Sequence, residues 1–513
     1  MTLAAQRREE LGWTRAVLIL SIAAAVRLLF ATIIPVFPDE AYYWLWSRNL
    51  APGYFDHPPV VALLIRLGGV LLLPLGLEAS GMAIRLGPIL AGWVAALATA
   101  GIAHRLGGSA AAIRASIIMS VMPLAAAGLV LATPDAGVLA ATALTLYCFV
   151  RALESDVGSR ESLRWWMATG LVLGVAFASK YTSIFLPLAI LIAVLIGGEL
   201  RARLREPGPY IACVLAALVF LPVLLWNSQH DWISFVFQLK HGLSAPKGSA
   251  LVAAWKHEGD FFGGQAALAS PILFILMGIV VTRAFRATAP SVCFALGVVA
   301  AVTFGFFIYS GVRQRVEPNW PAPAYIPAIV LLSIAAWTPR GERWLKGGIG
   351  LAGVMSFLIY VQALFPILPL RPAKDPIARA FGWAELAAAA ESTANVVRAE
   401  TNRRTWLGGD RYQEASELAL HVRGHPTTFS TNLAGRVNQF DLWPWFSLRA
   451  TPGDNLIFVV DDSEQPHAAV AALAPLFDEA RRGALVTLRR GRGEIGIRRI
   501  WELRGYHGGW PAR

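Results

Sequence analysis

Apolar stretches long enough to cross a lipid bilayer recur along most of the chain and then stop. They begin at Ala16 and end near Phe365, and most have roughly the 17 to 25 residues that span about 30 Å of hydrocarbon. We predict about eleven spans by this pattern. They lie near residues 16–36, 83–101, 113–131, 137–152, 165–179, 183–198, 209–226, 266–283, 290–310, 321–338 and 348–366. The sequence therefore predicts a mainly α-helical, polytopic membrane bundle within residues 1–370.

The pattern changes in the tail, residues 371–513, where shorter amphipathic segments replace the long apolar ones. Helical periodicity predicts helices at 383–398 and 413–422, and β-type runs occur at 455–460, 484–489 and 495–503. We expect a small soluble α/β domain. Between the first two spans, the loop at 37–82 contains an aromatic amphipathic segment at 41–49 and an apolar segment at 60–77, which suit helices lying in the membrane interface.

Composition supports a membrane protein and argues against a nucleic-acid-binding one. Hydrophobic residues make up 56% of the chain and charged residues 15%, and the mean hydropathy is +0.53. Such a chain has more apolar surface than the core of one soluble domain can bury. The net charge of +12 comes from short basic clusters between apolar stretches. The orientation of the spans in the membrane explains these clusters better than binding of nucleic acid does. The first apolar stretch carries Arg27 and lacks a small-residue cleavage site, so we interpret it as an uncleaved span.

The basic clusters occur in alternate loops, which predicts a cytoplasmic N-terminus by the positive-inside rule. An odd number of spans then places the tail outside, together with the loops at 37–82, 132–136, 180–182, 227–265 and 311–320. For a bacterial inner membrane, this side is the periplasm.

Two acidic motifs lie in the first outside loop. Asp39 and Glu40 in PDEAYYWLW could supply a general base or a divalent-cation ligand, or they are simply favourable charges at a helix N-terminus. Asp56 and His57 in GYFDHPP precede two prolines that restrict the backbone, and they suit metal or phosphate binding or an ordinary polar turn.

The run FPDEAYYWLWSRNLAPGYFDHPPVVALLIRLG resembles the opening loop of glycosyltransferase family 39 and of the protein mannosyltransferases. It is also similar to the lipid A aminoarabinose transferases and the rhizobial lipopolysaccharide galacturonosyltransferases. The resemblance covers about residues 16–366 and implies the C-type glycosyltransferase fold. It also implies an enzyme that moves a hexose or pentose from a polyprenyl-phosphate carrier to an envelope acceptor, which is lipid A or lipopolysaccharide, a glycan or a protein.

By this resemblance, Asp39 matches the essential first-loop aspartate and Glu40 the second acidic position. Asp56 matches the acidic residue of a Tyr-Phe-acidic-basic-Pro-Pro pattern, while His57 stands where the aminoarabinose transferases have lysine, which leaves the acceptor open. Arg85 matches the arginine that follows the first loop, although a snorkelling role is the alternative.

Five further residues are candidates to bind a substrate. Asp135 lies on a short outside turn where the family places another acidic residue. Lys180 and Tyr181 lie between two apolar spans, where a lysine is costly unless it has a partner such as phosphate. Arg313 and Arg315 interrupt the positive-inside trend, and guanidinium groups match phosphate geometry, although snorkelling would also account for them.

The motifs GDRYQEAS and GRVNQFDLWPW in the tail resemble segments of bacterial family 39 members, but their chemistry cannot be read from sequence. Their aromatic side chains either stack on sugars or form the core of the domain.

For the lipid-phosphate donor that the resemblance implies, the phosphate is already the leaving group, so no nucleotide-binding motif is required, and the sequence has none. The predicted reaction is a single displacement with inversion. Asp39 would orient or deprotonate the acceptor, and a divalent cation near Asp39 or Asp56 is one further expectation. We expect these carboxylates and the cations at positions 180, 313 and 315 to converge on one cavity at the outer leaflet. The alternative is a polytopic lipid or solute transporter, or flippase, although no repeated halves are visible.

Overall fold

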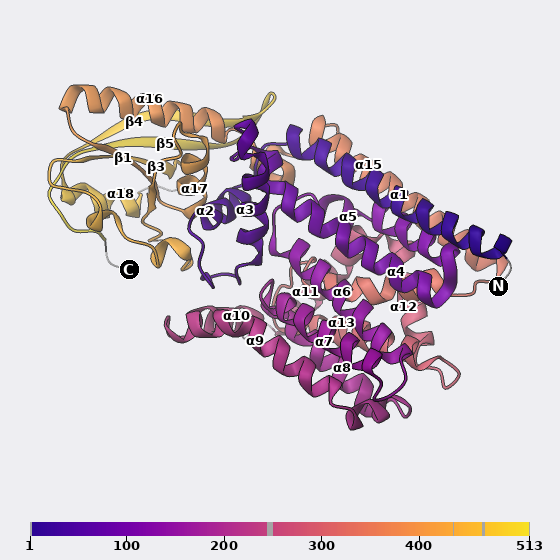
Figure 1. Ribbon diagram of the computed structural model, residues 1–513. Coiled ribbons are helices and arrows are strands. Elements are labelled where there is room, and N and C mark those ends of the chain that lie inside the picture. The colour runs from indigo at the N-terminus through magenta and orange to yellow at the C-terminus, as the bar shows by residue number, and fades with distance from the viewer. Residues whose placement is uncertain (1–2, 244–249, 434, 464–466, 512–513) are drawn as a thin grey trace. The chain divides into compact units, whose positions relative to one another are not determined.

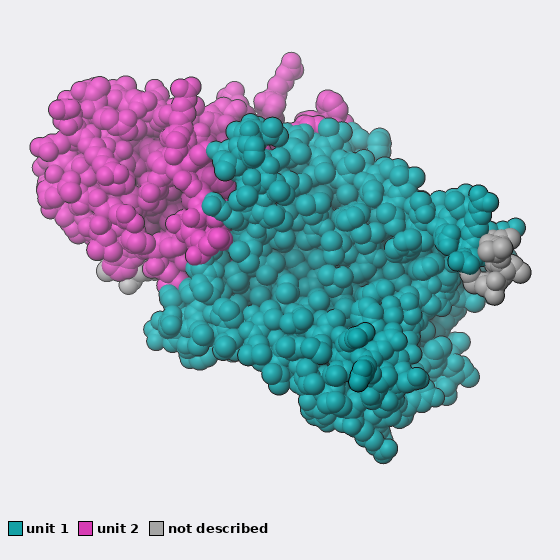
Figure 2. Space-filling view, in the orientation of Figure 1, with its two compact units in different colours: residues 1–32, 51–78, 82–361 teal, residues 33–50, 79–81, 362–513 magenta. Residues whose placement is uncertain are grey.

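The computed structural model describes the chain except residues 1–2, 244–249, 434, 464–466 and 512–513. It divides into two compact units (Figure 2). The first unit comprises residues 1–32, 51–78 and 82–361, and the second comprises residues 33–50, 79–81 and 362–513. The loop predicted at 37–82 is thus shared between them, and the two units are described separately below.

The first unit is helical, as predicted (Figure 1). Its helices are α1 (Leu3–Ile33), α3 (Val60–Leu72), α4 (Gly81–Val121), α5 (Pro123–Gly128), α6 (Pro134–Glu154), α7 (Arg160–Phe177), α8 (Phe185–Ile196), α9 (Gly208–Ser228), α10 (Ile233–Leu243), α11 (Ala250–Ala269), α12 (Pro271–Arg283), α13 (Ser291–Arg313), α14 (Tyr325–Ile334) and α15 (Pro339–Leu364). Short 3₁₀ turns, Tyr181–Ile184 and Ala322–Ala324, lead into α8 and α14.

Six helices within the described residues are long and apolar enough to cross a membrane, namely α1, α4, α6, α9, α13 and α15. Helices α11 and α12 form a pair bent by 100°, which gives up to seven spans, and three shorter apolar helical segments cover residues 60–75, 181–196 and 322–334. The predicted spans at 83–101 and 113–131 lie on either side of Gly108, whose φ of 71° breaks α4. Every predicted span has helical residues, but the number eleven is not confirmed.

Helix packing in the first unit relies on small residues, as is usual in membranes. A side chain at Gly170 of α7 would lie 2.3 Å from the backbone oxygen of Ala212 in α9, so this close approach requires glycine. Leu18 and Leu29 of α1 are 57% and 58% exposed. Exposed leucines along an apolar helix are expected where the solvent is lipid.

The second unit contains a five-stranded sheet with the order β2-β1-β3-β5-β4. Its strands are β1 (Thr405–Gly409), β2 (Thr428–Ser430), β3 (Asn455–Asp461), β4 (Phe477–Arg490) and β5 (Gly493–Tyr506). β1 pairs in parallel with β2 and β3, while β5 pairs antiparallel with β3 and β4. The helices are α16 (Trp383–Thr401), α17 (Tyr412–His421) and α18 (Ala468–Leu473). The predicted helices and β-type runs are confirmed, whereas β1 and β2 were not predicted.

The sheet of the second unit buries a separate apolar cluster on each face because strand residues alternate in direction. Ile457 and Val459 of β3 face α16, which lies along the sheet in Figure 1, whereas Leu456 and Phe458 belong to the opposite cluster. Helix α2 (Pro38–Arg48) also belongs to this unit. It confirms the helix predicted at 41–49 and begins earlier, with a proline at its first position, where proline is favoured.

Candidate active site

The adjacent carboxylates Asp39 and Glu40 lie in the first turn of α2 but have different surroundings. Glu40 is 1% exposed, and its Oε2 accepts a hydrogen bond from the backbone N–H of Phe37 at 3.0 Å. This bond satisfies a backbone donor at the start of the helix, so Glu40 stabilises α2. Asp39 is exposed, and its Oδ1 accepts a hydrogen bond from the hydroxyl of Tyr412 at 2.8 Å. Asp39 is therefore the carboxylate that a substrate can reach.

The tail motifs GDRYQEAS and GRVNQFDLWPW hold α2 in place. The hydroxyl of Tyr42 accepts a hydrogen bond from the backbone N–H of Gln439 at 2.6 Å. Its ring lies 4.6 Å from that of Tyr412 and stacks on Phe440 at 6.2 Å. Sequence reasoning missed this role because the two partners are separated by 397 positions and no local pattern joins them.

Glu417 on α17 adds a titratable group that the sequence analysis did not identify. It is buried, and one of its carboxylate oxygens lies 3.1 Å from Nε2 of His421. Burial raises the pKa of Glu417 to about 7, the nearby imidazole opposes that rise, and the carboxylates of Glu40 and Asp39 add to it. A carboxyl group that titrates near neutrality thus lies close to Asp39, as is common at functional sites.

In the first unit, three of the predicted outside loops meet around Asp135. Its Oδ1 is 2.6 Å from Nζ of Lys180, and its Oδ2 accepts a hydrogen bond from Nδ2 of Asn319, also at 2.6 Å. Asp135 and Lys180 are each 7% exposed. A buried charge requires such a partner, so Lys180 already has an anion beside it in the protein itself.

The other predicted substrate-binding residues have separate contacts. The hydroxyl of Tyr181 accepts a hydrogen bond from Nδ2 of Asn227 at 3.3 Å. Arg313 is exposed and lies over the ring of Tyr309 at 4.9 Å. Arg315 is also exposed, and its Nε lies 3.7 Å from a carboxylate oxygen of Glu317. Both guanidinium groups are therefore at the surface of the first unit.

Asp56, His57 and Arg85 are also in the first unit. Asp56 is buried, and its backbone carbonyl accepts a hydrogen bond from Nε2 of Gln238 at 2.7 Å. The backbone oxygen of His57 accepts from the N–H of Tyr54 at 3.3 Å, which closes the turn before the two prolines. Arg85 is fully buried and donates to the carbonyl of Ala31 at 3.3 Å, so it does not snorkel to the interface.

A divalent cation was one expectation for Asp39 and Asp56. Asp39 belongs to the second unit and Asp56 to the first. Across the described ranges there is no group of three or more His, Cys, Asp or Glu residues that could hold a metal ion. A divalent cation near Asp39 or Asp56 therefore stays a prediction, and the reaction proposed below assigns no step to a metal.

Comparison with known proteins adds an independent observation. The family described as dolichyl-phosphate-mannose-protein mannosyltransferase matches residues 56–226. Lipid A galacturonosyltransferase RgtD of Rhizobium johnstonii is 28% identical over 367 residues, which cover 70% of this chain and 72% of that protein.

Two solved structures are similar along most of the chain. ArnT from Cupriavidus metallidurans bound to undecaprenyl phosphate has a TM-score of 0.64 at 16% identity, over 97% of this chain and 99% of ArnT. The archaeal oligosaccharyltransferase AglB from Archaeoglobus fulgidus, in complex with an inhibitory peptide and a dolichol-phosphate, has a TM-score of 0.53 at 12% identity, over 90% of this chain and 70% of AglB. The predicted resemblance and the predicted fold are confirmed.

Proposed function

We propose that this chain, which has the C-type glycosyltransferase fold, is an inverting enzyme that moves a sugar from a polyprenyl phosphate to an envelope glycolipid. The lipid phosphate in the ArnT structure supports the donor class, and the name of RgtD supports lipid A or a related glycolipid as acceptor. The observation that carries the proposal is the exposed carboxylate of Asp39, which the hydroxyl of Tyr412 holds at the start of α2.

In the proposed reaction an acceptor hydroxyl oxygen attacks the anomeric carbon of the donor. The bond between that carbon and the phosphate oxygen breaks at the same time, and polyprenyl phosphate leaves with the electron pair. Asp39 takes the proton of the acceptor hydroxyl, as a general base does. Attack opposite to the leaving group inverts the anomeric carbon.

Cationic side chains would stabilise the charge that grows on the departing phosphate. The ammonium group of Lys180 has three N–H donors. Among the contacts between described residues, one of these donors is used, in the hydrogen bond to Asp135. Arg313 and Arg315 are exposed and present planar guanidinium groups that can bind two phosphate oxygens. Their convergence with Asp39 joins residues of two separate units and stays a prediction.

The test compares Asp39→Asn with Glu385→Gln, using the purified full-length protein in lipid nanodiscs. Glu385 is a matched control because it is an exposed carboxylate in the first turn of α16, another helix of the same unit. Polyprenyl-phosphate donors carrying a uronic acid, an aminopentose or a neutral hexose are offered with lipopolysaccharide, and the product is weighed by mass spectrometry. We expect Asp39→Asn to lose at least about 100-fold in rate, as removal of a general base does.

Wild-type turnover by the Asp39→Asn protein would remove Asp39 from catalysis. A transporter or flippase would move the lipid-linked sugar across a vesicle membrane and leave the mass of the acceptor unchanged.

We also propose that the protein is embedded in the inner membrane with the second unit in the periplasm. The tail contains no cysteine, so a single Leu448→Cys substitution, at a 73% exposed position, introduces a unique label there. In spheroplasts a membrane-impermeant maleimide should label that variant and should not label Arg201→Cys, in a predicted cytoplasmic loop. The reverse pattern would invert the topology.

A further inference from the structure

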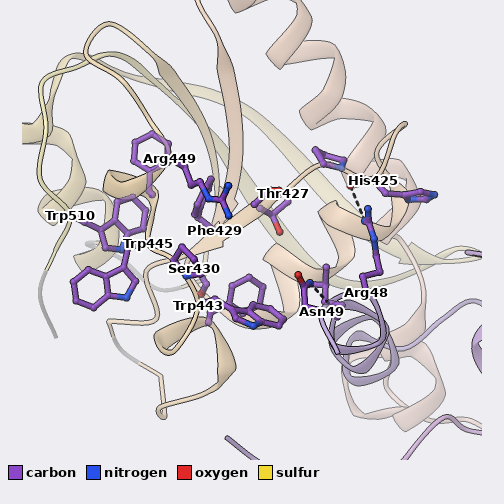
Figure 3. Close-up of a pocket in the computed structure, with 16 residues that line it drawn as sticks. Arg48, Asn49, His425, Thr427, Phe429, Ser430, Trp443, Trp445, Arg449 and Trp510 are labelled. Carbon is purple, nitrogen blue, oxygen red and sulfur yellow. Dashed lines mark hydrogen bonds between the residues drawn. The ribbon is translucent and has the colours of Figure 1, made fainter. Parts of the chain in front are cut away.

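A pocket of about 220 Å³ lies within the second unit, beside the C-terminal end of α2 (Figure 3). Its walls come from α2, from the segment at 425–430 that leads into and includes β2, and from the segment at 443–449. The side chains that line it are mainly aromatic or cationic, and no aspartate or glutamate occurs among the described residues of its wall.

The positive charge of the pocket comes from two arginines. Arg48, on α2, donates a hydrogen bond from its guanidinium to the carbonyl oxygen of His425 at 2.9 Å, shown dashed in Figure 3. This contact fixes Arg48 at the pocket wall. The backbone of His425, whose carbonyl oxygen accepts the hydrogen bond, is left-handed, with a φ of 49°. Arg449 is exposed, and no ion pair of its side chain occurs within the described part of the chain. Because no carboxylate balances these charges, the pocket favours an anion.

Aromatic side chains form the floor of the pocket and part of its rim. Phe429, Phe446 and Trp510 pack edge to face or tilted, with ring centroids 5.2 to 6.4 Å apart, and their contacts with the apolar cluster make them the floor. Trp445, by contrast, is 48% exposed at the rim. An indole kept at the surface of a pocket that also contains two arginines offers a flat apolar face that a sugar ring can cover.

We propose that this pocket binds an anionic saccharide, one whose sugar carries a phosphate or a carboxylate. Arg48 and Arg449 bind the anionic substituent, and Trp445 packs against the sugar ring. Guanidinium groups form paired, charge-assisted hydrogen bonds with phosphate and carboxylate, which explains the choice of arginine.

The pocket and Asp39 share helix α2, which relates the pocket to the sugar transfer; this relation rests on the proposed function. Arg48 lies nine residues after Asp39 on the same helix, and a rise of 1.5 Å per residue separates their Cα atoms by about 13.5 Å along the helix axis. That distance exceeds the length of one sugar ring. The occupant is therefore an oligosaccharide of the acceptor, with its charged unit in the pocket and another unit closer to Asp39.

The test measures binding to the full-length protein in nanodiscs by calorimetry, without any donor. The probes are an acidic core oligosaccharide released from lipopolysaccharide by mild acid, neutral maltoheptaose, and inorganic phosphate alone. We expect the acidic oligosaccharide to bind most tightly and its affinity to fall as salt is raised. Arg449→Gln and Trp445→Ala should each weaken binding by about tenfold, since a charge-assisted hydrogen bond or a packed ring is lost.

Matched controls lie in the same unit outside the pocket. Arg492→Gln, in the turn between β4 and β5, removes one exposed arginine, and Leu485→Ala, on β4, removes one exposed apolar side chain. Both should bind the acidic oligosaccharide like the wild type, and thermal unfolding checks that all variants are folded.

The inference is overturned if maltoheptaose binds as well as the acidic oligosaccharide, if inorganic phosphate alone binds equally well, or if the pocket variants bind like the controls. Failure of the proposed function is a separate outcome, because it is decided by sugar transfer with Asp39→Asn. If both hold, Arg449→Gln raises KM for the acceptor and leaves kcat unchanged, as the loss of ground-state binding does.

Discussion

Replacement of Lys180 by methionine tests the buried cluster of the first unit. Nζ of Lys180 lies 2.6 Å from Oδ1 of Asp135, and the two side chains are 9% and 10% exposed. Without the lysine, the carboxylate of Asp135 stays buried and keeps, among the contacts between described residues, the hydrogen bond from Asn319. Removing one member of a buried ion pair costs about 3 to 5 kcal/mol, because the remaining charge is unpaired. We expect Lys180→Met to be destabilised by that amount.

The double variant Asp135→Asn/Lys180→Met should recover most of this stability. It removes both charges, and an amide at position 135 can still pair with Asn319, so no buried charge is left without a partner. Arg315→Met is the control, since the pair between Arg315 and Glu317 is exposed and is worth at most about 1 kcal/mol. The free energy of unfolding is measured by denaturant titration in detergent, and sugar transfer is measured in parallel.

Two results would refute this reasoning in different ways. If Lys180→Met is as stable as the wild type, the ion pair is not a buried structural contact. If the double variant is both stable and fully active, the pair only stabilises the helices and Lys180 does not contact the donor phosphate. A stable but inactive double variant is the outcome we expect, because the departing phosphate then lacks its cation.

Three further changes probe the second unit. Tyr412→Phe removes the hydrogen bond to Asp39, so kcat should fall at least about tenfold in steady-state assays while the melting temperature stays the same. Burial raises the pKa of Glu417 from 4.5 to about 7, so the wild type loses stability as the pH rises from about 4.5 to about 7. In denaturant titrations, the free energy of unfolding of Glu417→Gln should match that of the wild type near pH 4 and exceed it at pH 8 by about 3 kcal/mol. Arg490→Met leaves Asp375 buried without its cation, which should cost about 3 to 5 kcal/mol in denaturant titration.

Each of these predictions has a result that would contradict it. An unchanged kcat in Tyr412→Phe would mean that Asp39 does not need its hydrogen bond for the reaction. An equal pH dependence in the wild type and Glu417→Gln would show that this carboxyl has an ordinary pKa. Wild-type stability of Arg490→Met would show that Asp375 finds another partner or is protonated.

The helices of the first unit could be predicted because a long apolar stretch has few alternatives in lipid. Backbone groups in the hydrocarbon must pair within the segment, so such a stretch becomes a helix wherever it is placed. The number of spans was harder to predict, since it depends on bends such as the 100° bend between α11 and α12, which the apolar pattern does not reveal. In the tail, β1 and β2 were missed because they are short, and β1 ends in two glycines, which weaken the strand pattern.

The sequence by itself determined that this protein is a membrane-embedded helical bundle with a small α/β tail, and that Asp39 and Glu40 form its most informative motif. Only the tertiary structure decided which of these two carboxylates is accessible, because burial depends on the elements packed around α2. The same holds for the contact of Gln439 with Tyr42 of α2 and for the contact of Asn319 with Asp135. These pairs are 397 and 184 positions apart in the sequence, and contacts at that range leave no local pattern. Local physics sets the helices, whereas the accessibility and pairing of charged groups are properties of the whole fold.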